Sequence, residues 1–274
     1  MFAPLLSDAA ALAFAWGCAA AVFIALLWPL SVRRTDASVV DFWWGPGVAF
    51  MALSVWVLTG APTGAHALAV TAITAAWGLR LGATLGARKL RERHEDPRYQ
   101  ELRNAWNPGF WWKSLFVVFT LQALLQGLVA LGALYAIKAP ATDPGLLGAL
   151  GAAVAVFGLL LEATADRQLD RFKTTAAPGA LCRDGLRAYV RFPHYSGEIA
   201  LWVGVALIAL EAGVWWAPAS AALIAALLIK VSGAPMLDEH LERSRPDYAV
   251  WKATTPASVP ERAAVREAAL RALG

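Results

Sequence analysis

The sequence predicts an all-α integral membrane protein with seven transmembrane helices, its N-terminus outside the cell and its C-terminus in the cytoplasm. Three observations indicate this fold. Hydrophobic residues make up 58% of the chain and charged residues 16%, whereas soluble domains have about 25% charged residues. Seven apolar runs have the length of a membrane span. The basic residues follow alternate runs, and loops rich in Lys and Arg stay in the cytoplasm.

The apolar runs cover residues 8–30, 39–59, 65–86, 111–137, 145–165, 195–212 and 214–233. Each run is long enough to cross about 30 Å of hydrocarbon at a rise of about 1.5 Å per residue. The first run follows no basic segment and ends in no cleavage pattern, so we interpret it as a retained helix. Pro and Gly at 60–64 and 138–144 end one helix and start the next on the outer side.

The longer connections are assigned to the cytoplasm. All of the 24 Lys and Arg residues except Arg80 and Lys138 belong to that side. We therefore expect one seven-helix domain over residues 1–260, with cytoplasmic loops at 87–110, 166–194 and 234–260, and a helical tail at 261–274. Basic residues that are spread along a bilayer point to lipid or to a soluble anion rather than to nucleic acid. We expect a monomer in the bacterial inner membrane or an equivalent membrane.

Four ionisable residues lie in or beside the apolar runs, near their cytoplasmic ends: Asp41, Arg80, Glu162 and Glu198. Such groups are costly in hydrocarbon, so each is a candidate functional residue. A shared polar pocket that opens to the cytoplasm would explain all four. The alternative is a set of helix-end charges that form ion pairs, such as Arg80 with Glu162. Gln122 and Gln126 present the same choice between a substrate pocket and helix–helix hydrogen bonds.

The segment 166–198 has the highest density of candidate binding residues. Residues 166–173 are expected to continue the fifth run as a polar helix outside the membrane. Arg and Lys side chains suit phosphate groups, and carboxylates accept hydrogen bonds from ribose hydroxyls. No Gly-x-Gly-x-x-Gly motif follows a strand, so helices and loops would have to hold any dinucleotide. His94 and His240 lack the spacing of metal ligands, and we predict no metal site.

The turn Arg191-Phe192-Pro193-His194-Tyr195-Ser196-Gly197-Glu198, after Gly185-Leu186 and Tyr189, resembles the signature of the steroid 5α-reductase family. In that signature a Gly-Leu…Tyr segment leads to Asn-aromatic-x-Gly-Glu. The bacterial branch often has Arg-His-Pro-Asn-Tyr-x-Gly-Glu, so here Phe192 replaces the His and His194 replaces the Asn. Segments 41–45, 77–82, 88–99 and 246–255 resemble the same branch in order and spacing. The resemblance covers about residues 39–260.

The resemblance implies an NADPH-dependent reductase whose cofactor site faces the cytoplasm. Hydride would reach the β-carbon of an α,β-unsaturated ketone, such as the Δ4 bond of a 3-oxo-steroid, while the enzyme hydrogen-bonds the enolate oxygen. The cofactor-binding residues carried over by position are Arg88, Arg91, Glu162, Asp166, Lys173, Arg183, Tyr189, Arg191, His194, Tyr195, Glu198, Asp238 and Tyr248. The candidate catalytic residues are Asp41, Trp77, Arg80 and Glu198. Trp77 stands at the position of the family's Tyr, and an indole N–H releases no proton in this range. Arg80 or a water would have to supply the proton instead.

Two other functions remain open. Isoprenylcysteine carboxyl methyltransferases, which use S-adenosylmethionine, have a related Arg-His-Pro-x-Tyr-x-Gly turn. S-adenosylmethionine has no phosphates, so the basic residues favour NADPH, as does the absence of His before Pro193. A non-catalytic scaffold or lipid-binding protein would bind no cofactor at all.

Overall fold

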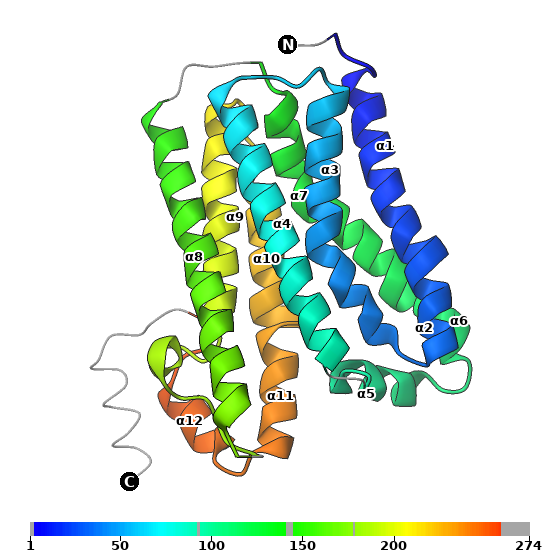
Figure 1. Ribbon diagram of the computed structural model, residues 1–274, viewed down its shortest axis with the longest axis vertical. Coiled ribbons are helices and arrows are strands. Elements are labelled where there is room, and N and C mark those ends of the chain that lie inside the picture. Colours follow the sequence, from blue (N-terminus) through cyan, green and yellow to red (C-terminus); the bar gives the residue numbers. More distant parts are fainter. Residues whose placement is uncertain (1–2, 92–93, 141–144, 178, 259–274) are drawn as a thin grey trace. The chain divides into compact units, whose positions relative to one another are not determined.

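In the computed structural model, which describes residues 3–91, 94–140, 145–177 and 179–258, these residues form helices and loops and no β-strand. Within these ranges, seven helices are long and apolar enough to cross a membrane (Figure 1). They are Asp8–Arg34, Ala37–Leu58, Ala65–Arg91, Phe110–Lys138, Leu146–Thr175, Pro193–Glu211 and Pro218–Ser244. The prediction of an all-α protein with seven spanning helices is confirmed. The predicted tail at 261–274 lies outside the described residues.

Several spanning helices are composite. The first consists of α1 (Asp8–Ala21), a π-helical turn (Val22–Leu27) and α2 (Trp28–Arg34), and the second of a 3₁₀ helix (Ala37–Trp43) and α3 (Trp44–Leu58). The third is α4 (Ala65–Arg91), and the fourth joins α6 (Phe110–Ser114), a π-helical turn (Leu115–Thr120) and α7 (Leu121–Lys138). The fifth and sixth are α8 (Leu146–Thr175) and α9 (Pro193–Glu211). The seventh comprises α10 (Pro218–Ala226), a π-helical turn (Leu227–Val231) and α11 (Ala234–Ser244).

Within the described residues, two shorter α-helices and one 3₁₀ helix (Gly185–Ala188) lie outside the spans. Helix α5 (Pro97–Trp106) belongs to the connection between the third and fourth spans, and α12 (Tyr248–Thr254) follows the seventh. The chain forms two compact units. Unit 1 comprises Met1–Ala153 and Val203–Ala221, and unit 2 comprises Val154–Trp202 and Ala222–Gly274.

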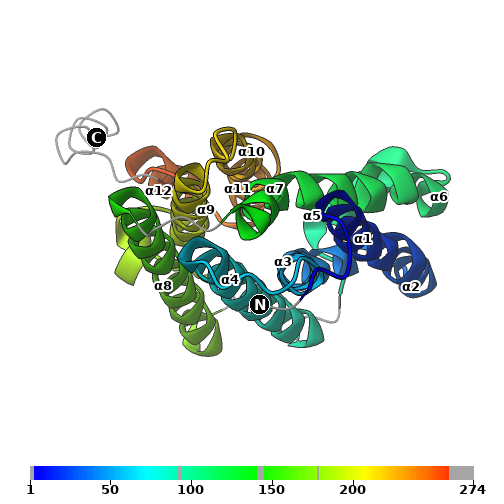
Figure 2. The ribbon, with the colours of Figure 1, turned by 90° about the horizontal axis from the view of Figure 1, so that it is seen from above.

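The centre of unit 1 is the contact between α3 and α4, with α1 and α7 packed beside them (Figure 2). The two backbones touch at a pair of glycines. A Cβ atom on Gly45 would lie 2.3 Å from the carbonyl oxygen of Gly78, and one on Gly78 would lie 2.2 Å from that of Gly45. No residue with a side chain fits at these distances, so the glycines set how closely the two helices approach.

We expect Gly78→Ala to destabilise the protein by about 1–3 kcal/mol, because the added methyl group forces the two helices apart. The matched control is Gly17→Ala in α1, where a Cβ would meet nothing within 4 Å. That change should be neutral or stabilise the helix by up to about 1 kcal/mol. Thermal unfolding of both detergent-purified variants measures the difference. Equal unfolding temperatures would contradict the close contact.

Glu211, at the end of α9, caps the start of α8 within unit 1. Its carboxylate accepts hydrogen bonds from the backbone N–H groups of Gly145 at 3.0 Å and Gly148 at 2.8 Å. The first N–H groups of a helix have no partner within the helix, and a negative charge there is favourable. The cap therefore satisfies two donors that hydrocarbon would leave unpaired.

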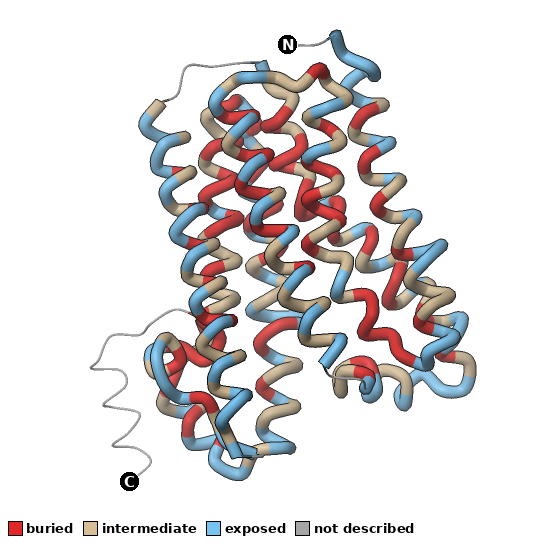
Figure 3. Tube along the Cα trace, in the orientation of Figure 1, coloured by how far each residue is buried: buried red, intermediate tan, exposed pale blue. Residues whose placement is uncertain are grey.

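The spanning helices keep large apolar side chains on their outer faces. Exposed examples are Phe14 in α1, Leu79 in α4, Leu124 in α7, and Phe157 and Leu160 in α8. Figure 3 shows exposed positions alternating with buried ones along the long helices. A lipid environment suits such a surface, whereas water does not. Together with the seven apolar helices, this surface makes the chain a multi-pass membrane protein.

Candidate functional site

Asp41 lies in the 3₁₀ helix at the start of the second span and binds α5 through both carboxylate oxygens. Oδ2 accepts a hydrogen bond from Nη2 of Arg98 at 2.9 Å. Oδ1 accepts one from the hydroxyl of Tyr99 at 2.5 Å. The structure thus joins two segments, 41–45 and 96–99, that share the family resemblance.

The hydrogen bonds continue into the membrane helices. The Tyr99 hydroxyl accepts a hydrogen bond from Nε2 of Gln122 at 3.0 Å, and Oε1 of Gln122 accepts one from the indole N–H of Trp44. We call these five residues (Asp41, Arg98, Tyr99, Gln122 and Trp44) the Asp41 network. Burial, followed by the charge of Asp41, raises the pKa of Tyr99 well above its usual value. Tyr99 therefore keeps its proton at neutral pH.

Gln126, one turn beyond Gln122, makes a helix–helix contact. It is fully buried, and its Nε2 donates to the carbonyl oxygens of Trp43 and Trp44, each at 2.9 Å. A Cβ on Gly47 would lie 2.4 Å from that nitrogen, so the glycine makes room for the amide. Of the two interpretations of this pair, helix–helix hydrogen bonding applies to Gln126, and Gln122 belongs to the Asp41 network.

Ion pairs fix α5 and the end of α4 against the start of the second span. Lys89 lies 2.5 Å from Oδ2 of Asp36, and Arg103 lies 2.7 Å from Oε1 of Glu95. The same Glu95 oxygen accepts a hydrogen bond from the N–H of Ala37 at 2.7 Å.

The remaining site residues predicted in unit 1 all lie on α4. Trp77 is buried and Arg80 follows one turn later, whereas Arg88 and Arg91 belong to the last turn. Sequence reasoning missed Tyr99 and Arg98 as site residues. The sequence pointed to them only through the Asp96-Pro97-Arg98-Tyr99 segment, which resembles the bacterial branch. That resemblance does not show that the segment contacts Asp41.

In unit 2, Arg191 and Asp238 form a buried bidentate ion pair, with 5% and 8% of their surfaces exposed. Nη2 and Nε of Arg191 donate to the two oxygens of Asp238 at 2.8 and 3.2 Å. The Tyr248 hydroxyl also donates to Asp238. The second Arg191 terminal nitrogen donates to the carbonyl oxygens of Lys252, at 3.1 Å, and Thr255. We call Arg191, Asp238 and Tyr248 the Arg191 clamp.

The three residues of the Arg191 clamp were predicted to bind the cofactor. In the structure, Arg191 and Tyr248 both contact Asp238. Burial, followed by the hydrogen bond to Asp238, raises the pKa of Tyr248, so its hydroxyl stays a donor. The backbone adds to the clamp, because the N–H groups of Arg191 and Phe192 donate to the carbonyl oxygens of Pro256 and Ala257 at 2.9 and 2.8 Å. Residues after α12 thus run beside the turn that starts α9.

The structure explains why the motif has a glycine at position 185, before Leu186. Gly185 has a φ of +62°, a conformation that residues with side chains disfavour. A Cβ there would also lie 2.5 Å from Oε1 of Gln168, and that oxygen accepts a hydrogen bond from the N–H of Leu186 at 3.0 Å. The glycine therefore lets the loop return to α8.

Other predicted residues of unit 2 lie on α8 and at the start of α9. Glu162 and Asp166 are on the buried face of α8, and a Cβ on Gly197 would lie 2.5 Å from the backbone nitrogen of Glu162. The rings of His194 and Tyr195 lie 4.1 Å apart, centroid to centroid. Glu198, on α9, is partly buried, and Lys173, on α8, is exposed. Tyr189, which follows the 3₁₀ helix Gly185–Ala188, is also exposed. The predicted pocket shared by Asp41, Arg80, Glu162 and Glu198 draws on both units and stays a prediction.

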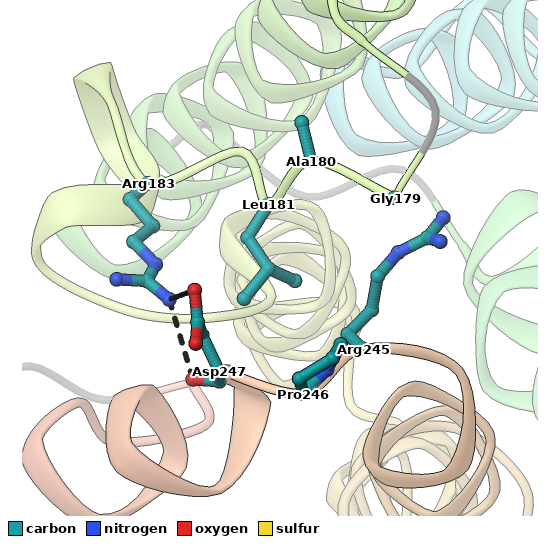
Figure 4. A pocket seen from close by; sticks show the side chains of 7 residues that line it. All are labelled: Gly179, Ala180, Leu181, Arg183, Arg245, Pro246 and Asp247. Carbon is teal, nitrogen blue, oxygen red and sulfur yellow. Dashed lines mark hydrogen bonds and ion pairs between the residues drawn. The ribbon is translucent and has the colours of Figure 1, made fainter.

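A pocket of about 300 Å³ lies in unit 2 between the loop after α8 and the connection from α11 to α12 (Figure 4). Its lining consists of Gly179, Ala180, Leu181, Arg183, Arg245, Pro246 and Asp247. Nη2 of Arg183 donates to the backbone oxygen of Asp247 at 3.2 Å and lies 3.9 Å from its carboxylate. Sequence reasoning named Arg183 but missed Arg245, whose only signal was its place before the Pro246-Asp247-Tyr248 segment.

A family model described as "Protein of unknown function (DUF1295)" matches residues 27–255. The match includes the Asp41 network, the Arg191 clamp and the pocket. No curated protein and no solved structure matches the chain.

Proposed function

The chain belongs to the DUF1295 family, and from this starting point we propose that it is an NADPH-dependent membrane reductase. Its reaction would be the reduction of the C=C bond of an α,β-unsaturated ketone, as in the steroid 5α-reductases that its motifs resemble. The best-fitting substrate class is a hydrophobic enone such as a 3-oxo-Δ4-steroid, which a membrane protein can take up from the lipid.

One observation supports this proposal above the others. The loop 166–194 and the segment after α11 were both expected to hold a dinucleotide, and together they line a pocket with two arginines, Arg183 and Arg245. Guanidinium groups suit phosphate oxygens because their N–H groups form a planar fork. The donor set of these segments therefore fits the phosphate-rich cofactor, with Lys173 as a further exposed cation on α8.

NADPH, when bound, supplies the hydride. The residues of this chain would hold the ketone and move the proton. A donor at the ketone oxygen stabilises the enolate charge as it develops, and a second group returns a proton to the α-carbon. In the Asp41 network, Tyr99 is a hydroxyl that keeps its proton at neutral pH. The indole N–H of Trp77 can donate a hydrogen bond but releases no proton in this range. We assign the role of hydrogen-bond donor at the ketone oxygen to Tyr99. Its single O–H proton, which Asp41 accepts in the structure, would turn to the ketone oxygen in the reaction, while Asp41 positions the side chain.

The orientation of the chain follows from its charges. Because Lys and Arg concentrate on one side of the spans, we assign the N-terminus to the outside, and the C-terminus and the cofactor site to the cytoplasm of a bacterial cell or its equivalent. NADPH is then available from the cytoplasm, and the enone from the lipid.

The test is the unfolding temperature of the detergent-purified protein with NADPH, NADH or S-adenosylmethionine. A ligand at 100 times its dissociation constant stabilises the folded state by about 2.7 kcal/mol, so NADPH should raise the unfolding temperature. Stabilisation by S-adenosylmethionine alone would replace the reductase with a methyltransferase. No response to any of the three would favour a scaffold or lipid-binding role.

We expect Lys173→Ala and Glu198→Ala to weaken NADPH binding by about tenfold each, the loss of about 1.4 kcal/mol that one hydrogen bond to a charged group contributes. Arg171→Ala is the matched control, because Arg171 is an exposed cation two positions before Lys173 on α8. Titration of the cofactor by fluorescence compares the variants. Unchanged affinity in both site variants would remove them from the cofactor site.

A further inference from the structure

The pocket in unit 2 has two cationic ends and an apolar middle. Figure 4 shows Leu181 between Arg183 and Arg245, with Pro246 next to Arg245. Arg183 already contacts Asp247 through the hydrogen bond at 3.2 Å. The lining therefore has a paired arginine at one end and a second arginine at the other.

Arg245 extends toward Gly179 in the loop after α8 (Figure 4). Its Nη1 would lie 3.9 Å from a Cβ at Gly179, and the φ of Gly179 is +89°, so a side chain is disfavoured there. The same nitrogen has a hydrogen bond of 3.4 Å to the carbonyl oxygen of Ser244, at the long end of the accepted range. Within the part of the chain that the structure describes, this is the one hydrogen bond of the Arg245 guanidinium, so most of its donors are available to a ligand.

The size and chemistry of the pocket suit one end of a nucleotide. At about 300 Å³, the pocket is at the lower limit of the roughly 300–1,000 Å³ found for ligand sites. It has room for a purine nucleoside but not for a whole dinucleotide. Leu181 and Pro246 offer apolar surface to a purine ring, and the Asp247 carboxylate offers an acceptor to its amino group or to a ribose hydroxyl.

We propose that this pocket binds the adenosine 2′-phosphate end of NADPH, and that Arg245 distinguishes NADPH from NADH. The inference rests on the proposed reductase function and adds the subsite and the residue that selects the phosphorylated cofactor. A phosphomonoester is a dianion that pairs with a guanidinium fork, whereas the free 2′-hydroxyl of NADH gains little from it.

An anionic lipid headgroup offers the same phosphate chemistry. The lining residues favour the nucleotide, because 179–183 and 245–247 all lie outside the spanning helices. A lipid phosphate would also leave the apolar surface of Leu181 and Pro246 without a ring to cover it. The experiment therefore includes a lipid arm.

The experiment measures the affinity of the full-length protein for NADPH, NADH and adenosine 2′,5′-bisphosphate by isothermal titration. We compare the wild type with Arg245→Gln, Arg245→Lys and the control Arg243→Gln. Arg243 is exposed, pairs with Glu239 on the same helix and does not line the pocket. We expect Arg245→Gln to weaken NADPH and the bisphosphate by about tenfold, to leave NADH unchanged, and to act more strongly than Arg245→Lys.

Each other outcome has a defined meaning. Equal NADPH affinity in the wild type and Arg245→Gln overturns the pocket assignment and leaves the reductase proposal intact. A wild type that binds the bisphosphate through Arg245 but not NADPH supports the pocket and overturns the reductase. Binding of neither nucleotide overturns both. If phosphatidylglycerol vesicles, but not nucleotides, stabilise the wild type in an Arg245-dependent way, the pocket holds a lipid headgroup and the nucleotide assignment fails.

Discussion

Replacement of Asp238 by alanine is expected to destabilise the folded protein by about 3–5 kcal/mol, because it leaves a buried arginine without its partner. Arg191 is 5% exposed and uses two nitrogens on Asp238, at 2.8 and 3.2 Å. The Tyr248 hydroxyl would lose its acceptor in the same step. Thermal unfolding in detergent measures the effect.

Two further variants test whether this loss of stability comes from the unpaired buried charge. Glu239→Ala, at the next position, removes one side of an exposed ion pair with Arg243 and should change stability by no more than about 1 kcal/mol. The double variant Arg191→Met/Asp238→Leu removes both buried charges and should recover much of the lost stability. If Asp238→Ala unfolds no earlier than Glu239→Ala, the clamp does not stabilise unit 2.

The same variants distinguish a structural role of the Arg191 clamp from a role in NADPH binding. Arg191, Asp238 and Tyr248 were predicted to contact NADPH, yet the structure joins them to one another. If the folded double variant binds NADPH as tightly as the wild type, these residues support the site without touching the cofactor. If its affinity falls while its stability recovers, the predicted contact is correct.

Asp41→Ala is expected to lower the turnover of an enone by about 10²-fold or more, the range for a lost acid–base contribution, while NADPH affinity stays within about twofold. Asp41 accepts the hydrogen bond of Tyr99 at 2.5 Å and pairs with Arg98 at 2.9 Å. Without it, Tyr99, the proposed hydrogen-bond donor at the ketone oxygen, loses its position. Tyr99→Phe removes only the hydroxyl and should give a similar loss.

The control for this prediction is Asp36→Ala. Asp36 pairs with Lys89 at 2.5 Å and helps to fix the start of the second span, but it lies outside the Asp41 network. A strong loss of turnover in Asp41→Ala and Tyr99→Phe, with near-normal turnover in Asp36→Ala, supports the chemical role. Equal losses in all three would mean that the segment needs only to be anchored, and full turnover in Asp41→Ala would remove Asp41 from the mechanism.

The spans themselves could be predicted because each one depends only on residues that are neighbours in the sequence. A chain in hydrocarbon must satisfy its backbone hydrogen bonds within each helix, so an apolar run of sufficient length indicates a helix. The ends of the helices were less predictable. The third span continues to Arg91 instead of 86, because hydropathy detects apolar residues whereas a helix continues through polar ones outside the membrane. The polar extension at 166–173 was predicted and is part of α8, which ends at Thr175.

By itself, then, the amino-acid order determined the seven helices, the clustering of positive charge and the turn motif around Arg191. The tertiary structure alone decided which side chains meet. Asp41 and Tyr99 are 58 positions apart, and Arg191 and Asp238 are 47 apart. Hydropathy and motif spacing describe neighbours along the chain, whereas hydrogen bonds and ion pairs at these separations depend on how whole helices and loops pack. For that reason the pairing of Arg183 with Asp247, and the place of Arg245 beside it, became visible only in the folded chain.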